Sequence, residues 1–226
     1  MYTAVTIKTV RFMKKELDQQ ASEIEFLLIS VVQGLALQML AVSALEPISM
    51  FRTEYWFYIV SAFILILVFW SQAIMHALSF IDWPIDLVHT FLYFLASFVE
   101  VMVFNQITHP LKWYLFGSAF LLIAGLLYAY DLFMIRRHKN KFFRSKAKKK
   151  LYDHMYTQQV KEMRLFLPAA LLYNVFAAFL IFRFPQMYIG QNYHILLAGV
   201  QTIGSVFLLL NTIGTFKLRS AIIDRM

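Results

Sequence analysis

Residues 56–80 read WFYIVSAFILILVFWSQAIMHALSF, a run of 25 residues that contains no Asp, Glu, Lys or Arg. Crossing the ~30 Å hydrocarbon core of a bilayer takes about 20 residues of α-helix. Apolar and polar residues do not alternate along the run, so it predicts a helix rather than a barrel strand. The stretch therefore indicates a chain built from membrane-spanning helices.

Five further apolar stretches are long enough to cross a membrane. We place these spans at 26–48, 85–106, 112–135, 165–185 and 193–216. Proline and glycine residues mark the breaks between them, as expected for loops. Composition agrees, because 60% of the chain is hydrophobic and 15% is charged, whereas a soluble domain is about half apolar and about a quarter charged. We predict an all-α polytopic membrane protein with six transmembrane helices.

Two polar segments complete the predicted organisation. Residues 1–25 are mixed in character and predict an N-terminal interfacial helix rather than a removable signal peptide. Residues 26–226 form the six-helix transmembrane domain, within which residues 136–164 form a basic cytoplasmic loop. Gly and Pro are missing between Leu126 and Leu167. We therefore expect the fourth and fifth spans to continue as helices beyond the membrane.

The distribution of positive charge predicts the orientation of the chain. Of the 21 Lys and Arg residues, 18 fall in the N-terminal segment, the 136–164 loop and the C-terminal tail. Loops rich in Lys and Arg stay in the cytoplasm. Both termini are therefore predicted to be cytoplasmic, in a protein of the bacterial inner (plasma) membrane.

The basic loop has two interpretations. Its candidate basic surface comprises Arg136, Arg137, Lys139, Lys141, Arg144, Lys146, Lys148, Lys149 and Lys150. Such a surface can bind anionic lipid, a cytoplasmic protein or, less in keeping with this chain, nucleic acid. We favour the simpler interpretation, a charge block on the inner leaflet, because fixing the orientation alone requires one.

The sequence offers little support for an enzyme. It has no cysteine, which excludes thiolate metal sites and cysteine nucleophiles, and it lacks the common nucleotide-binding and hydrolase motifs. We expect no cofactor and no metal. The alternative is a metal site where His76, Asp82, Asp86 and His89 meet at the inner end of the second and third spans. Capping of a tight helical hairpin explains the same residues, and we favour it.

The third span carries an isolated carboxylate. In FLYFLASFVEVMVFNQ, residues 91–106, Glu100 has no cation three or four residues away. Ionisable groups inside a membrane are costly and usually face protein or water. Spacings of three and four residues place these side chains on one helical face: Asp86, His89, Tyr93, Ser97 and Glu100. This polar stripe is either the wall of a permeation path or interhelical hydrogen bonding.

Other spans supply candidate partners for that stripe. Ser30 and Gln33 should share a face of the first span, with Gln38 on a neighbouring face, and Gln201 lies in the sixth span. Each taken alone is explained by interhelical hydrogen bonding. Together with the stripe they are candidates for a pore. We predict that Glu100 faces a buried polar cavity or pore in the outer half of the bundle, within reach of Gln33, Gln38 or Gln201.

The plan of the chain resembles the lysosomal potassium channels and their bacterial homologues. The segments that carry the resemblance are LISVVQGLALQMLAVSALE at 28–46, FW at 69–70 and DLVHTFLYFLASFVEVMVF at 86–104. The resemblance implies an oligomer of six-helix units in which the first helix lines the pore. Of the family's Phe-Ser-Asp signature, only Ser30 corresponds, and Val31 stands in place of the aspartate.

Two functions remain open on the sequence. The first is an oligomeric channel or permeation protein, for which cations are the expected ions. The second is a non-conducting membrane sensor, anchor or assembly partner that acts through its basic cytoplasmic helices. The expected partners are the lipid bilayer, further copies of the chain, and either anionic lipid or a cytoplasmic protein.

Overall fold

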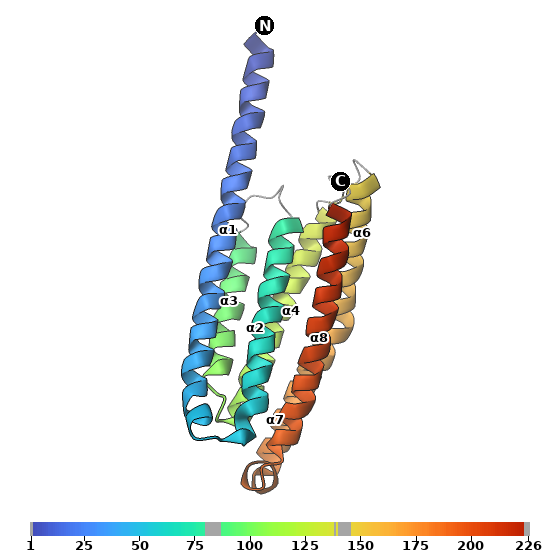
Figure 1. Ribbon diagram of the computed structural model, residues 1–226. Helices are drawn as coiled ribbons and strands as arrows, with labels where there is room; N and C mark the ends of the chain where they lie inside the picture. The colour runs from blue at the N-terminus through green and yellow to red at the C-terminus, as the bar shows by residue number, and fades with distance from the viewer. Residues whose placement is uncertain (1, 80–86, 138, 140–145, 224–226) are drawn as a thin grey trace.

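The protein is a bundle of long helices. The computed structural model describes residues 2–79, 87–137, 139 and 146–223 (Figure 1). Within these residues there is no β-strand, so the predicted all-α class is confirmed. The helices are α1 (Tyr2–Ser49), α2 (Trp56–Ser79), α3 (Leu87–Phe104), α4 (Pro110–Arg137), α6 (Lys146–Lys161), α7 (Leu167–Arg183) and α8 (His194–Ile223), with short helical segments η1 (Thr53–Tyr55), η2 (Glu162–Phe166) and η3 (Gln186–Gly190).

Six stretches of helix are long and apolar enough to cross a membrane, as predicted. Five of them belong to α1, α2, α3, α4 and α8. The remaining one is a continuous rod of α6, η2 and α7, apolar and helical over Lys149–Arg183. This rod accords with the lack of Gly and Pro before Leu167. The chain is an integral membrane protein.

Both ends of the chain lie at the same end of the bundle (Figure 1). We call this the terminal end, and it also holds the start of α6. The opposite end, which we call the hairpin end, holds the turns from α1 to α2, from α3 to α4 and from α7 to α8. Six antiparallel crossings return the chain to the side on which it began.

Helix α1 is longer than one membrane span. It runs for 48 residues from Tyr2 to Ser49, and its first part projects beyond the bundle (Figure 1). The separate N-terminal helix expected over residues 1–25 is thus continuous with the first span. The first 33 residues contain neither Gly nor Pro, so nothing in their backbone chemistry breaks the helix. That this extension rests on a membrane surface stays a prediction.

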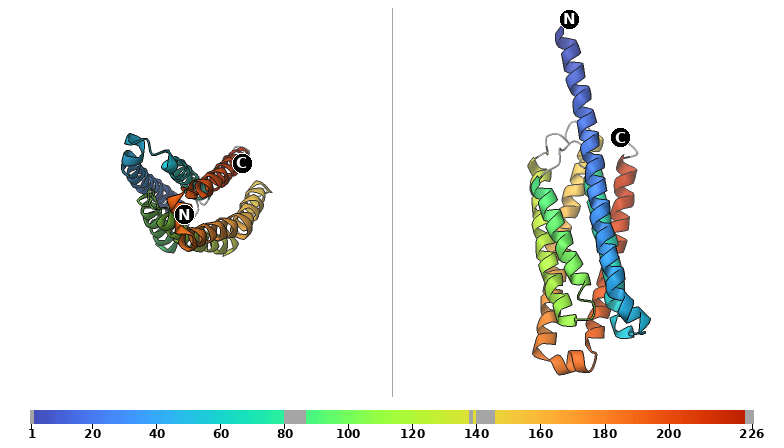
Figure 2. Two further views of the ribbon diagram at one scale, coloured as in Figure 1. Left: turned by 90° about the horizontal axis from the view of Figure 1, so that it is seen from below. Right: turned by 90° about the vertical axis from the view of Figure 1, so that its left-hand side faces the viewer.

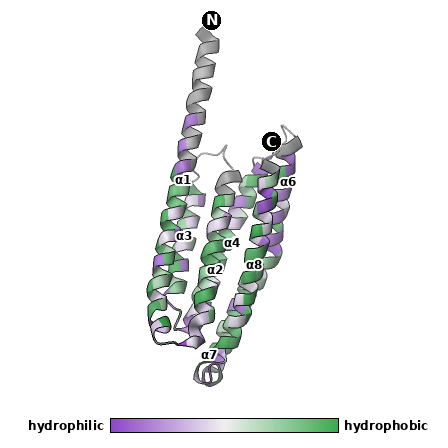
Figure 3. Ribbon diagram, viewed as in Figure 1, coloured by the Kyte–Doolittle hydropathy of each residue, from purple (hydrophilic) through white to green (hydrophobic). Residues whose placement is uncertain are grey.

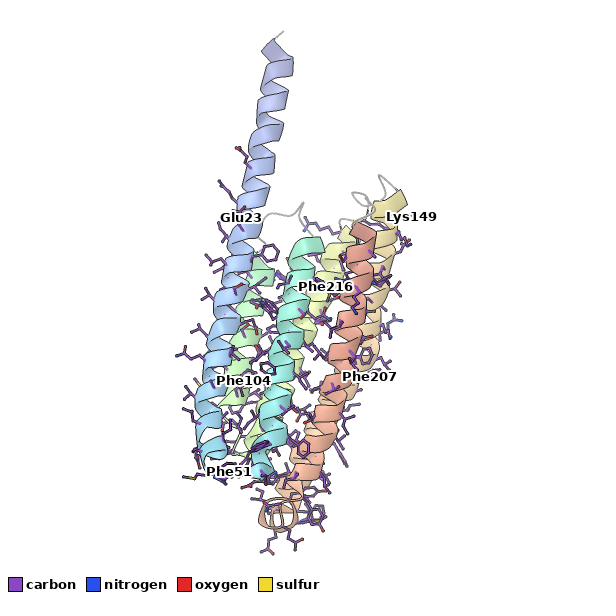
Figure 4. The ribbon with its side chains drawn as sticks, in the orientation of Figure 1. Glu23, Phe51, Phe104, Lys149, Phe207 and Phe216 are labelled. Atoms are coloured by element: carbon purple, nitrogen blue, oxygen red, sulfur yellow. The ribbon has the colours of Figure 1, made fainter. Side chains whose placement is uncertain are left out.

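The helices are packed unequally. Seen along the bundle, α1 and α3 lie on one side and α6, α7 and α8 on the other (Figure 2). The most apolar window is 39% buried in each of the spans of α2, α3 and α4, but only 11% buried in that of α8. Phe207 illustrates this on the outward side of α8, where it is 60% exposed (Figure 4). This surface of α8 faces lipid or another protein.

Hydropathy follows the same geometry. Hydrophobic residues cover the middle of α2 and α8, and hydrophilic residues gather where α6 and α8 meet at the terminal end (Figure 3). Near the hairpin end the core is aromatic, with the ring of Tyr58 edge-on to Trp113 at 5.2 Å. The core of the bundle is therefore apolar towards the hairpin end and more polar towards the terminal end.

One glycine sets the distance between α4 and α7. A Cβ atom built on Gly117 would lie 2.7 Å from Asn174 Oδ1, closer than side chains normally approach. Asn174 is itself buried and donates a hydrogen bond from Nδ2 to the carbonyl of Ala170 at 2.8 Å. Any larger residue at 117 would push the Asn174 amide away.

Candidate functional site

The isolated carboxylate of the third span lies in the protein interior. Glu100 is 0% exposed, and Tyr93 and Ser97 are buried on the same face of α3. This face packs against α1 and α4. The predicted stripe is therefore directed into the bundle over its Tyr93–Glu100 part.

Gln33 of α1 connects two members of this stripe. Its Nε2 atom donates to Glu100 Oε2 and to Tyr93 OH, each at 3.3 Å. We call Gln33, Tyr93, Ser97 and Glu100 the core cluster. Because the two bonds share one nitrogen, they hold the carboxylate and the phenol within the reach of a single water molecule.

The core cluster has more oxygen atoms than donors. Gln33 Oε1, Ser97 Oγ and Glu100 Oε1 are buried and have no hydrogen-bond partner within the described part of the chain. The described residues also provide no ion pair to Glu100. An ionised carboxylate in this place would keep its full charge in an apolar surrounding with one long hydrogen bond, which is costly.

A cavity of about 60 Å³ lies on the terminal-end side of the core cluster. Helices from all six spans line it, and its polar lining includes Gln72, His89, Tyr93, Tyr128, Asp131, Gln159 and Arg219. One water molecule needs about 10–15 Å³ by the same measure, so the cavity has room for about four. Tyr93 belongs to both the cavity wall and the core cluster, and it joins the two.

Charged groups gather around this cavity, and we call them the terminal cluster: His89, Asp131, Glu162 and Arg219. His89 Nε2 lies 3.4 Å from Asp131 Oδ1. Glu162 is 4% exposed and accepts a hydrogen bond of 2.6 Å from Gln158 Nε2. Arg219 is 7% exposed and interacts electrostatically with Glu162. Positive and negative charge thus offset each other in this cluster.

Two predicted pore residues lie elsewhere. Ser30 and Gln38 are exposed on the outward side of α1, away from Glu100. The expectation that Ser30 shares a face with Gln33 is wrong in this structure. The reason is the rotation of α1, whose buried face is centred on Gln33, Ala36 and Leu40 and leaves Ser30 outside its edge.

Gln201 is also engaged away from Glu100. Its Oε1 accepts a hydrogen bond of 2.9 Å from Trp113 Nε1. It lines a second cavity of about 330 Å³ between α2, α4, α7 and α8. Glu100 lines neither this cavity nor the one at the terminal end. The expectation of a carboxylate that faces open space is therefore corrected to one packed against Gln33.

Sequence reasoning missed Asp131, Glu162 and Arg219. Asp131 is a second carboxylate inside an expected span, so the argument applied to Glu100 could have found it. Glu162 and Arg219 were counted with the charges outside the membrane, whereas both are buried. The signal was available for Glu162, since the Gly- and Pro-free segment around it predicts a helix long enough to pack on the bundle.

The candidate metal residues are not brought together in the described structure. Asp82 and Asp86 lie outside the described residues, and His89 pairs with Asp131. Within the described ranges no group of three His, Asp or Glu side chains could hold a metal ion.

The basic surface is partly described. Arg136, Arg137, Lys139, Lys149 and Lys150 are exposed, and Lys149 marks the terminal end of α6 (Figure 4). Arg136 also donates from Nη2 to Tyr156 OH at 2.9 Å. Lys146 and Lys148 belong to α6, whereas Lys141 and Arg144 lie outside the described residues.

No family model, curated protein or solved structure matches this chain. The resemblance of its plan to the lysosomal potassium channels stays a prediction. Function has to be argued from the buried polar groups themselves.

Proposed function

We propose that the protein is an oligomeric permeation protein that conducts a cation along the polar core of its helix bundle. The observation that supports this is Glu100, a completely buried carboxylate without a cationic partner, linked through Gln33 and Tyr93 to a polar cavity. Ionisable groups at membrane depth are expensive, and they typically mark the path of an ion. A purely structural hydrogen bond does not need a carboxylate in this place.

The outward side of α1 supports an assembly of several copies. Gln38 lies near the middle of the Phe26–Ser49 span and is exposed in the single chain. An amide in hydrocarbon gains a hydrogen-bond partner when helices associate. A Cβ built on Gly34 would meet nothing within 4 Å, so a neighbouring helix can approach closely there. Ser30 lies on the outward side as well.

The proposed orientation places the terminal end in the cytoplasm of a bacterial cell, across the inner membrane. It rests on the concentration of Lys and Arg at that end. The chain has no cysteine, so single cysteines at Ser49, Gln191 and Ser145 can be labelled one at a time in intact cells. We expect an impermeant reagent to label the first two positions and not the third, and the reverse pattern would invert the protein.

Reconstituted liposomes test the permeation proposal. We expect the purified protein to be oligomeric in detergent and to dissipate a cation gradient after reconstitution. Glu100→Gln keeps the size and hydrogen bonding of the side chain and removes its charge, and it should abolish most of the flux. Asp153→Asn is the matched control, because Asp153 is an exposed carboxylate of α6. A monomeric protein that is impermeable to every cation would contradict the proposal.

The basic surface favours one other candidate, a membrane sensor or anchor. Lys149 and Lys150 are exposed at the terminal end, where they can meet anionic lipid or a soluble protein. If they meet lipid, Lys149→Gln and Lys150→Gln should each weaken binding to anionic vesicles by about 1 kcal/mol, and salt should screen the effect. Loss of one soluble partner with unchanged vesicle binding would favour the sensor.

A further inference from the structure

The contacts of Glu100 restrict the ion that it can bind. Its nearest polar neighbour is an amide N–H group of Gln33, at 3.3 Å, and not a shell of oxygen atoms. A hard metal cation is held by several oxygen ligands at once. Glu100 is 0% exposed and lines neither described cavity, so a cation with its own water shell has no room beside it. A proton needs no such space.

Protonation also resolves the unpartnered oxygen atoms. A carboxylic acid is neutral and carries an O–H donor, which suits a cluster with a surplus of acceptors such as Gln33 Oε1 and Ser97 Oγ. The Gln33 amide can present its N–H to the ionised carboxylate and, when it is turned over, its oxygen to the acid. Gln33 can therefore hydrogen-bond Glu100 in both states.

The surroundings of Glu100 contain no fixed charge in the described part of the chain. Gln33 faces it from α1, and Tyr93 and Ser97 face it from α3. From α2, Phe69 stacks on the ring of Tyr93 with centroids 5.2 Å apart. No neighbouring charge thus holds Glu100 in its ionised form.

The described structure gives Glu100 a route to one end only. Towards the terminal end, Tyr93 OH is bonded to the same amide nitrogen as Glu100 and its ring lines the cavity with room for about four water molecules. Towards the hairpin end, the buried side chains that follow are Val103, Phe104 and Ile107. These apolar residues separate Glu100 from the hairpin end.

From this geometry we propose that the permeating ion is the proton, that Glu100 binds it, and that Tyr93 and the terminal-end cavity deliver it. The inference rests on the proposed function and specifies its ion. Loading breaks an O–H bond of a hydronium ion in the cavity and forms one on the Glu100 carboxylate, with Tyr93 OH or one water between them. Release to the hairpin end breaks that bond again after the apolar segment around Phe104 moves aside.

The test uses the full-length protein in liposomes that contain a pH-sensitive dye, with Na⁺ and K⁺ gradients measured in parallel. The wild type should collapse a pH gradient and leave the Na⁺ and K⁺ gradients intact. Glu100→Gln should abolish proton flux, and Tyr93→Phe should slow it. Asp153→Asn should match the wild type. Size-exclusion profiles confirm that each variant is folded and assembled.

Glu100→Asp covers the case in which Glu100→Gln does not fold. It keeps an acid and withdraws it from Gln33, so it should conduct protons more slowly than the wild type. Flux of Na⁺ or K⁺ without protons would overturn the inference and leave the permeation proposal standing. No flux of any cation through folded wild-type protein would overturn both. Equal proton flux in the wild type and in folded Glu100→Gln, or in Glu100→Asp if Glu100→Gln fails, would overturn the inference.

Discussion

Two glutamates are buried in this bundle, and their surroundings differ. Glu162 accepts a hydrogen bond of 2.6 Å from Gln158 and has the buried Arg219 as an electrostatic partner. Glu100 has one amide at 3.3 Å and an oxygen atom without a partner. The first carboxylate is offset by a cation on another helix, while the second is not. Burial alone therefore does not identify a functional carboxylate, but burial without compensation does.

The compensated pair ties separate helices together. Glu162 begins the π-helical segment between α6 and α7, and Arg219 lies near the end of α8. Single π-helical turns often occur where a side chain has to be turned towards a particular partner. Glu162 and Arg219 hold the terminal end of α8 to the rod of α6, η2 and α7, and we assign them a structural role.

The largest effect should come from removing the cation of this pair. Arg219→Leu leaves Glu162 buried without its partner, which should lower the free energy of unfolding by about 3–5 kcal/mol. Denaturant titration in detergent measures this loss. Combining Arg219→Leu with Glu162→Leu should restore much of the stability, because no buried charge is then left. Additive losses in the double variant would show that the two residues do not compensate each other.

A smaller effect should distinguish the two glutamates directly. Glu162→Gln removes a charge-assisted hydrogen bond and should cost about 2 kcal/mol. Glu100→Gln should change the stability by less than about 1 kcal/mol, because a neutral side chain replaces one that is already neutral as an acid. Thermal unfolding of the two variants side by side gives the comparison. A larger loss for Glu100→Gln than for Glu162→Gln would break it.

Tyr93 should contribute less to stability than to transport. Tyr93→Phe removes the hydrogen bond from Gln33 and keeps the stacking on Phe69, so it should cost about 1 kcal/mol. Tyr93→Leu also removes the ring and should cost clearly more. If both substitutions cost the same, the ring rather than the hydroxyl would be unimportant, and the core cluster would need another description.

The smallest effect should come from an exposed ion pair at the hairpin end. Arg52 donates to Glu46 Oε1 at 3.0 Å and to Glu54 Oε1 at 3.1 Å. The hydrogen bond to Glu54 raises the pKa of Arg52 further above its usual value, so Arg52 keeps its charge throughout the working pH range. Arg52→Gln should cost less than about 1 kcal/mol, and high salt should reduce even that. A larger or salt-independent loss would show that exposed and buried pairs do not differ as described.

Much of the fold could be predicted from the sequence, because spanning a membrane imposes length and hydrophobicity that single residues reveal. Glu100 could be found for the same reason, as a carboxylate in an apolar run. The rotation of each helix could not, since in lipid both the buried and the outward faces of a span are apolar. This is why Gln33 was placed correctly while Ser30 and Gln38 were not.

The partners of the other buried charges depend on contacts that sequence does not show. Glu162 and Arg219 belong to helices that the loop and the tail were not expected to bury. Each looks like one more charge at the edge of the membrane. Only the packing of α6 and α8 at the terminal end brings them together.

Infrared spectroscopy tests the central claim most directly, because a protonated carboxyl group has a C=O stretching band that an ionised carboxylate lacks. The spectrum of the wild type in lipid at neutral pH should contain such a band from a buried acid. We predict that Glu100→Gln removes this band and that Glu162→Gln leaves it in place. A band that survives in folded Glu100→Gln, or that disappears in Glu162→Gln, would contradict the account.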